Sequence, residues 1–115
     1  MRIRNAFAVA VGAGLLIAAV PAVANAATGD FSYRYLSADD QWHEAHLADP
    51  ASRDCITLPQ AADENATAPA DTPRNRTNAT ATVFAGVDCT GEWFTLKPLT
   101  GRAGERLKVR SVIFS

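Results

Sequence analysis

Short stretches of alternating apolar and polar side chains, separated by turn-forming residues, constrain this chain most strongly. Between Asp30 and Leu36, the aromatic residues Phe31, Tyr33 and Tyr35 alternate with polar ones, which is the two-residue period of a half-buried strand. No stretch combines sustained helical periodicity with helix caps. The sequence therefore predicts an all-β fold, a small Greek-key β-sandwich whose strands are separated by short Gly, Asp and Pro turns.

Turn-forming residues define the other expected strands. Residues 37–40 have the short polar side chains of a turn, so 30–36 and 41–47 are expected to pair as a hairpin. The remaining expected strands are 55–58, a strand that begins near Thr77 and continues into Val83 and Phe84, 93–98 and 107–114.

The segment from Pro59 to Thr82 contains no Val, Ile, Leu, Met, Phe, Tyr or Trp. Without such side chains a segment cannot offset the conformational entropy that it loses on ordering. We therefore expect an exposed, mobile loop near 59–76, and a strand only from about Thr77, where threonine becomes frequent.

The first 26 residues have the layout of a secretory signal peptide. Arg2 and Arg4 precede an apolar run at 6–20, and a small-residue cleavage site ends at Ala26. Pro21 ends the run before it reaches the roughly 20 residues that a membrane-spanning helix needs, which favours cleavage over a membrane anchor. We expect a secreted protein with no membrane segment after cleavage, and one domain at 27–115.

The expected mature chain is small and mildly acidic. Cleavage removes two of the 11 basic residues and none of the 12 acidic ones, which leaves 89 residues with a net charge of −3. Such a charge provides no electrostatic reason to bind nucleic acid or anionic lipid. A domain of this size buries only about 60 to 65% of its unfolded surface, so its core is marginal. We expect it to act as a monomer.

Cys55 and Cys89 are the two cysteines of the chain. After export they meet an oxidising compartment, which favours a disulfide. Closing this loop would stabilise the domain by about 3 to 4 kcal/mol. Free thiols and metal ligation are the alternatives, although two cysteines without a paired CxxC motif or a nearby histidine make a poor zinc site.

Phe84 and Gly91 are separated by six residues, and Ser111 follows that glycine by twenty. Here the sequence resembles the βγ-crystallin Greek-key motif, and more closely the small secreted bacterial proteins of that fold, which include metalloproteinase inhibitors and killer-toxin-like proteins. The resemblance covers 55–115. It implies a folded-back hairpin in which Phe84 packs over the turn, Gly91 adopts a positive φ and Ser111 bonds unpaired backbone. Cys89 would tie this hairpin to the strand at 55–58.

The resemblance also bears on calcium. Calcium-binding members of the family have two Asp or Asn residues five and four positions before the serine, where this chain has Arg106 and Leu107. Ca²⁺ requires oxygen ligands, which neither residue supplies in its side chain. We expect no metal and no other cofactor.

Other sequence features have structural as well as functional explanations. The sequence HEAH at 43–46 is one residue shorter than the zinc motif HExxH, and on a strand His43 and His46 would point to opposite faces. Trp42 and Trp93 are candidate contact residues for carbohydrate or protein, although packing at the sandwich surface is the favoured explanation.

These observations favour a secreted, non-catalytic binding or structural module whose ligand the sequence does not identify. An extracellular proteinase inhibitor is the alternative, because the resemblance includes such inhibitors and because Arg74 and Arg76 are expected in an exposed loop beside the disulfide. Its partner would be a proteinase. A second alternative is an antimicrobial, killer-toxin-like effector. No catalytic residue is predicted.

Overall fold

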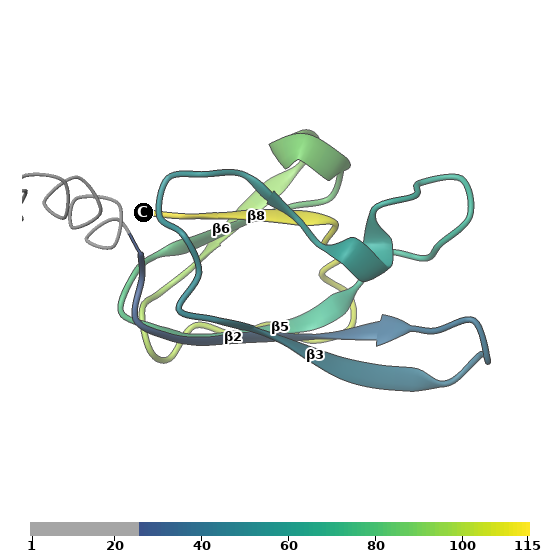
Figure 1. Cartoon of the computed structure of the whole chain (residues 1–115), viewed down its shortest axis with the longest axis horizontal. Helices are drawn as coiled ribbons and strands as arrows, with labels where there is room; N and C mark the ends of the chain where they lie inside the picture. The colour runs from purple at the N-terminus through teal and green to yellow at the C-terminus, as the bar shows by residue number, and fades with distance from the viewer. Residues whose placement is uncertain (1–25) are drawn as a thin grey trace, which may run out of the picture.

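The computed structural model describes residues 26–115 of the chain (Figure 1). The predicted signal peptide lies outside the described residues, except for Ala26 at its end. Within 26–115, no helix is long and apolar enough to cross a membrane.

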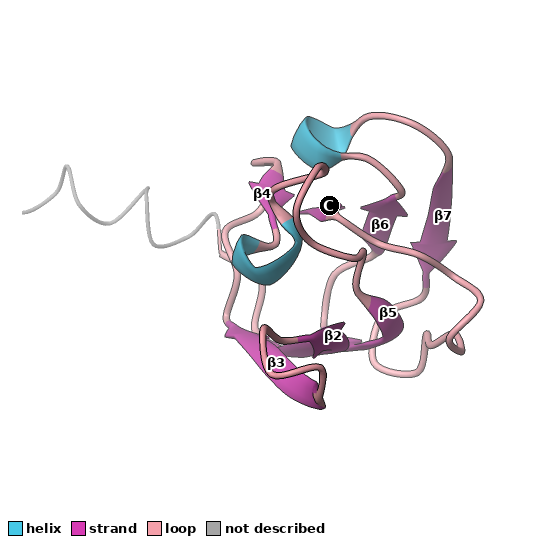
Figure 2. Cartoon of the chain, turned by 90° about the vertical axis from the view of Figure 1, so that its right-hand side faces the viewer, coloured by secondary structure: helices cyan, strands magenta, loops and turns pink. Residues whose placement is uncertain are grey.

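Two antiparallel sheets form the two layers visible in Figure 1, and the all-β prediction is confirmed. The first sheet has the order β3-β2-β5, and the second has the order β4-β8-β6-β7. In Figure 2 the first sheet lies below the second. The elements are β2 (Gly29–Leu36), β3 (Trp42–Ala48), β4 (Ile56–Thr57), the 3₁₀ turn η2 (Pro59–Ala61), β5 (Asp71–Thr77), β6 (Ala81–Phe84), the 3₁₀ turn η3 (Val87–Cys89), β7 (Trp93–Leu96) and β8 (Ser111–Phe114).

The predicted hairpin is confirmed as β2 and β3, which pair from Asp30 opposite Ala48 to Leu36 opposite Trp42. The alternating aromatics determine which face of β2 is buried, because Phe31 and Tyr33 point into the core. Apolar side chains from both sheets complete the core, and the rings of Phe31 and Phe114 meet edge to face across it at 5.3 Å. The other large members are Leu58, Val83, Leu96, Val109 and Val112.

The prediction of a loop near 59–76 is wrong from Asp71 onward, because β5 begins there and continues to Thr77. β5 has no apolar residue larger than Pro73, and hydrogen bonds order it instead. The side-chain amide nitrogen of the buried Asn75 donates to the backbone oxygens of Ala79, Leu96 and Lys97 at 2.8 to 3.1 Å. The side-chain oxygen of Asn75 accepts from the backbone amide and the hydroxyl of Thr77.

Residues 62–70 do form a loop, and Arg110 holds it. The guanidinium of Arg110 donates to the carbonyl oxygens of Ala61 at 2.9 Å and Thr67 at 2.8 Å. The last strand is also shorter than expected, because β8 begins at Ser111 rather than at residue 107. Val109 pairs with Ala70 in an isolated bridge instead.

A segment from the second half of the chain borders the first sheet. Arg102 pairs with Arg74 in an isolated antiparallel bridge. The backbone amide of Asn75 donates to the carbonyl oxygen of Gly101 at 2.8 Å, and the backbone amide of Ala103 donates to the carbonyl oxygen of Pro73 at 3.1 Å. Residues 101–103 therefore cover the free edge of β5.

Candidate functional site

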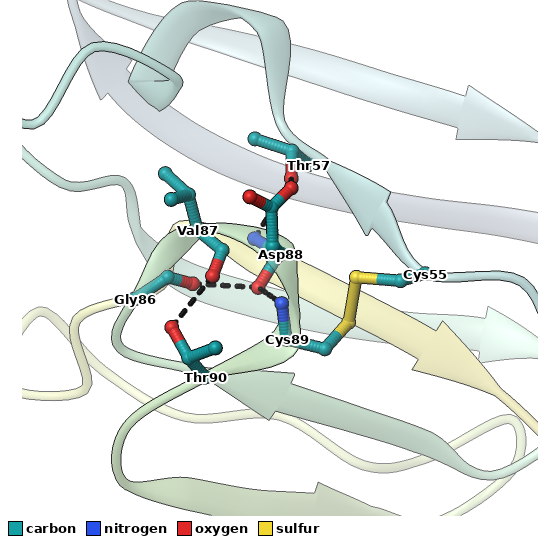
Figure 3. The surroundings of a disulfide bond; sticks show 8 residues. Cys55, Thr57, Gly86, Val87, Asp88, Cys89 and Thr90 are labelled. Atoms are coloured by element: carbon teal, nitrogen blue, oxygen red, sulfur yellow. Dashed lines mark hydrogen bonds between the residues drawn. A yellow bond between two sulfur atoms is a disulfide. The ribbon is translucent and has the colours of Figure 1, made fainter.

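A disulfide connects Cys55 to the turn at residues 86–91, which we call the corner around Cys89 (Figure 3). Cys55 and Cys89 are bonded with an S–S distance of 2.08 Å, which confirms the predicted disulfide. The Ser111 hydroxyl accepts a hydrogen bond from the Cys89 amide at 2.8 Å and donates one to the Gly86 carbonyl at 2.6 Å. Gly91 has a φ of 84°. The bonds of Ser111 and the φ of Gly91 are those that the family resemblance led us to expect.

The same corner contains two residues in a conformation that the sequence does not signal. Asp88 and Cys89 both have positive φ, at 56° and 55°, which costs energy for residues other than glycine. Thr57 holds this geometry, because its hydroxyl oxygen accepts from the Asp88 amide at 3.0 Å. The bonds at this corner are internal to the protein, so its role is structural.

The candidate binding site is the outer face of the first sheet, which points away from the core. Strand register assigns the residues to this face: Ser32 lies opposite His46 on one side and Arg74 on the other, and Arg74 in turn lies opposite Arg102. Arg76 is two residues from Arg74 on β5 and shares its face. Three exposed arginines, Arg74, Arg76 and Arg102, thus meet at one side of the sheet; we call them the arginine cluster.

Among residues 26–115, no member of the arginine cluster forms an ion pair, although Asp30 lies directly opposite Arg76 on β2, where its carboxylate bonds to His46. The backbone hydrogen bonds from Asn75 to Gly101 and from Ala103 to Pro73 lie on either side of the Arg74–Arg102 bridge. Arg74 and Arg102 are therefore a non-hydrogen-bonded pair of the antiparallel ladder. This geometry brings opposite side chains closest, with Cα atoms about 4.5 Å apart. Like charges in directly opposite positions destabilise a sheet.

A hollow of about 350 Å³ lies at the arginine cluster. Thr100 and the backbone of Gly101 form part of its wall. Gly101 is required there, because a Cβ at this position would lie 2.4 Å from the Lys97 nitrogen. We call this space the cationic hollow; its other lining residues are Arg74, Asn75, Arg76, Leu99 and Arg102.

A second hollow, of about 290 Å³, adjoins the first and shares Arg74 with it. We call it the tryptophan hollow, because Trp42 is its largest exposed apolar side chain, with 44% of its surface accessible. Its remaining lining residues are Ser32, Tyr33, Arg34, His43, Glu44 and Thr72.

A chain of contacts fixes Trp42 in position. The guanidinium of Arg34 lies 4.1 Å from the centre of the Trp42 ring, in the geometry of a cation–π contact. Arg34 also donates two hydrogen bonds to Asp71, at 2.8 and 3.1 Å. Burial would raise the pKa of Asp71, but the hydrogen bonds from Arg34 and Thr72 and the nearby positive charges outweigh it and hold that pKa below its usual range.

The structure brings together some predicted site residues and separates others. Trp42 and Arg74 line the same hollow and Arg76 lines the adjoining one, whereas Trp93 lies on β7 in the second sheet. Arg102 was missed, and no local signal marks it, because its importance comes from a pairing with a residue far away in the sequence.

The histidines of HEAH do not meet at a metal site. His46 lies on the outer face, where its Nδ1 is 2.8 Å from a carboxylate oxygen of Asp30; this hydrogen bond raises the pKa of His46. His43 packs against Tyr35, with ring centres 5.8 Å apart. In the described part of the chain, no group of three or more His, Cys, Asp or Glu side chains could hold a metal ion.

Comparison with protein-family models, curated proteins and solved structures finds no match for this chain. The interpretation of the site therefore depends on its own geometry and chemistry.

Proposed function

We propose that this protein is a secreted, non-catalytic binding module whose ligand carries anionic groups. The observation that carries the proposal is the Arg74–Arg102 pair, in which two like charges lie directly opposite each other beside a hollow. An oxyanion in that hollow would turn the repulsion into attraction, since a guanidinium donates paired hydrogen bonds to carboxylate, sulfate or phosphate oxygens.

A net negative charge does not oppose this proposal. Binding responds to the local field of a cleft, and a cluster of one sign raises the local concentration of the opposite ion. The disulfide between Cys55 and Cys89 indicates an oxidising, extracellular environment, where such a ligand would be met.

The inhibitor alternative rested on the family resemblance and on an exposed loop with two arginines, and the second of these supports is lost. Arg74 and Arg76 were expected in an exposed loop beside the disulfide, but they lie within β5. An arginine on a sheet face cannot enter a protease cleft as a protruding loop does.

We also propose that the two sheets are a pair of Greek keys of the βγ-crystallin kind. With residues 101–103 included, the first sheet has the order β3-β2-β5-(101–103), and the second, taken from its other end, has the order β7-β6-β8-β4. Each half of the chain thus contributes a hairpin and a fourth element to its own sheet and a third element to the other sheet. This arrangement supports the proposed fold.

Binding of poly-L-glutamate at low ionic strength, measured by titration calorimetry, tests the anion-binding function. Arg102→Ala is expected to weaken binding about tenfold, the loss of one charge-assisted contact. Arg106→Ala is the matched control, since it removes the same charge from an exposed arginine outside the cluster. Equal affinities of the two variants would overturn the proposal.

A further inference from the structure

The two adjoining hollows differ in chemistry, and this difference points to the class of ligand. The cationic hollow offers positive charge, whereas the tryptophan hollow combines an aromatic ring with hydroxyl, imidazole and carboxylate groups. We infer that the ligand is an acidic polysaccharide, with one sugar ring against Trp42 and the acid groups of neighbouring units on Arg74, Arg76 and Arg102. This inference rests on the proposed anion-binding function.

The first step concerns Trp42, which is held in place before any ligand arrives. Asp71, with 1% of its side chain exposed, fixes Arg34, and Arg34 lies against the Trp42 ring. A flat ring that is fixed yet 44% exposed suits the apolar face of a sugar ring, because little conformational freedom is lost on binding. Exposed tryptophans of this kind combine an apolar surface with a polar edge.

The second step concerns the polar groups around Trp42. Glu44 and the hydroxyl oxygen of Thr72, whose proton is donated to Asp71, supply hydrogen-bond acceptors, and Arg74 supplies donors. Sugar hydroxyls need such mixed partners. Glu44 also repels an acid group, so the charged part of the ligand belongs on the other side of Arg74, in the cationic hollow.

The third step concerns length. Arg76 lies two residues beyond Arg74 on β5, which is roughly 7 Å along a strand. Two separated cationic positions and a neighbouring ring site suit a linear polymer with repeated acid groups better than a single small anion. Because Arg74 lines both hollows, one extended ligand could contact both.

An acidic peptide fits this face less well. Extended peptides commonly bind by adding a strand to a free sheet edge, but residues 101–103 already occupy the edge of β5 beside the arginines. The amide of Thr72 likewise donates to Gly104 at 3.3 Å. A peptide would therefore lack backbone partners at the arginine cluster, whereas a polysaccharide needs none.

The test compares three probes of equal charge on the full mature protein: alginate hexasaccharide, chondroitin 4-sulfate hexasaccharide and a capped hexaglutamate peptide. At least one hexasaccharide is expected to bind about fivefold or more tightly than the peptide. The two hexasaccharides distinguish carboxylated from sulfated sugars. If neither exceeds the peptide, the inference is overturned while the anion-binding function stands.

Variants locate the selectivity. Trp42→Ala should abolish the preference for the saccharide, because it weakens saccharide binding more than hexaglutamate binding, whereas Trp42→Phe should retain most of that preference. Arg102→Ala should weaken all three probes. Trp93→Ala, on the second sheet, is the control and should change none. An unchanged preference in Trp42→Ala would refute the sugar-ring role, and unchanged binding of all probes in Arg102→Ala would refute the proposed function itself.

Discussion

Asp71 accepts two hydrogen bonds from Arg34, at 2.8 and 3.1 Å, although only 1% of its side chain is exposed. Lys108 lies 3.7 Å from its second oxygen. The ionised form of Asp71 is therefore built into the folded state, and it supports the contact of Arg34 with Trp42.

The lowered pKa of Asp71 predicts acid sensitivity. A carboxyl whose pKa is lower in the folded state than in the unfolded state contributes stability above the unfolded value, near 3.9, and loses it as pH falls through the folded value. In urea denaturation across this range, Asp71→Asn should show a smaller loss of stability on acidification than wild type. The exposed Asp54→Asn is the control and should behave as wild type does. Equal acid dependence in all three proteins would contradict the prediction.

The Arg74–Arg102 pair predicts that one arginine is kept at a cost in stability. Arg102→Ala should raise the free energy of unfolding by about 0.5 kcal/mol at low salt, because it removes repulsion between directly opposite charges. Added salt should reduce the difference, since it screens exposed charges. Chemical denaturation at two ionic strengths measures both effects. A destabilised Arg102→Ala at low salt would show that the pair is not repulsive.

Among polar residues, Asn75 is expected to have the largest effect on the free energy of unfolding when it is replaced. Its side-chain amide donates hydrogen bonds to three backbone carbonyl oxygens. Asn75→Ala should therefore lower the free energy of unfolding by about 3 kcal/mol, because these buried acceptors lose their donor. Asn65→Ala, in the exposed loop, should change it by no more than about 0.5 kcal/mol. Similar unfolding midpoints for the two variants would argue against the bonding described.

The disulfide predicts a comparable loss. The double variant Cys55→Ala, Cys89→Ala should be less stable by about 3 to 4 kcal/mol, since the unfolded chain regains the freedom of a loop closed across 34 positions. Reduction of the wild type should give a similar loss. Denaturation curves that coincide with and without reductant would be inconsistent with this effect.

The sequence predicts those parts of the fold that rest on local pattern. The period-two aromatics identify β2 and its partner β3, and the two cysteines suggest their own bond. β5 could not be found in this way, because Asn75 is ordered by carbonyls about twenty residues later in the chain. An apolar pattern is absent where hydrogen bonds, rather than hydrophobic burial, order a strand.

The binding face shows the same limit. Arg74, Arg76 and Trp42 could be chosen from the sequence as candidates, but the sequence assigns the arginines to a loop. Arg102 lies in a polar, glycine-bearing stretch, and only its bridge to Arg74 makes it part of the site. Net charge was equally uninformative, because it is a sum over the whole molecule. It does not show that three arginines lie together at one side of one sheet.

Residues 101–103 complete the edge of a sheet whose other strands lie in the first half of the chain. During synthesis, that sheet stays incomplete until residues 101–103 have emerged, so we expect stable structure to form only after them. We expect a chain ending at Lys97 to remain unfolded by circular dichroism; a native-like spectrum would disprove this. Such late folding would suit the secretion proposed above, because an unfolded chain can still be threaded through a narrow channel.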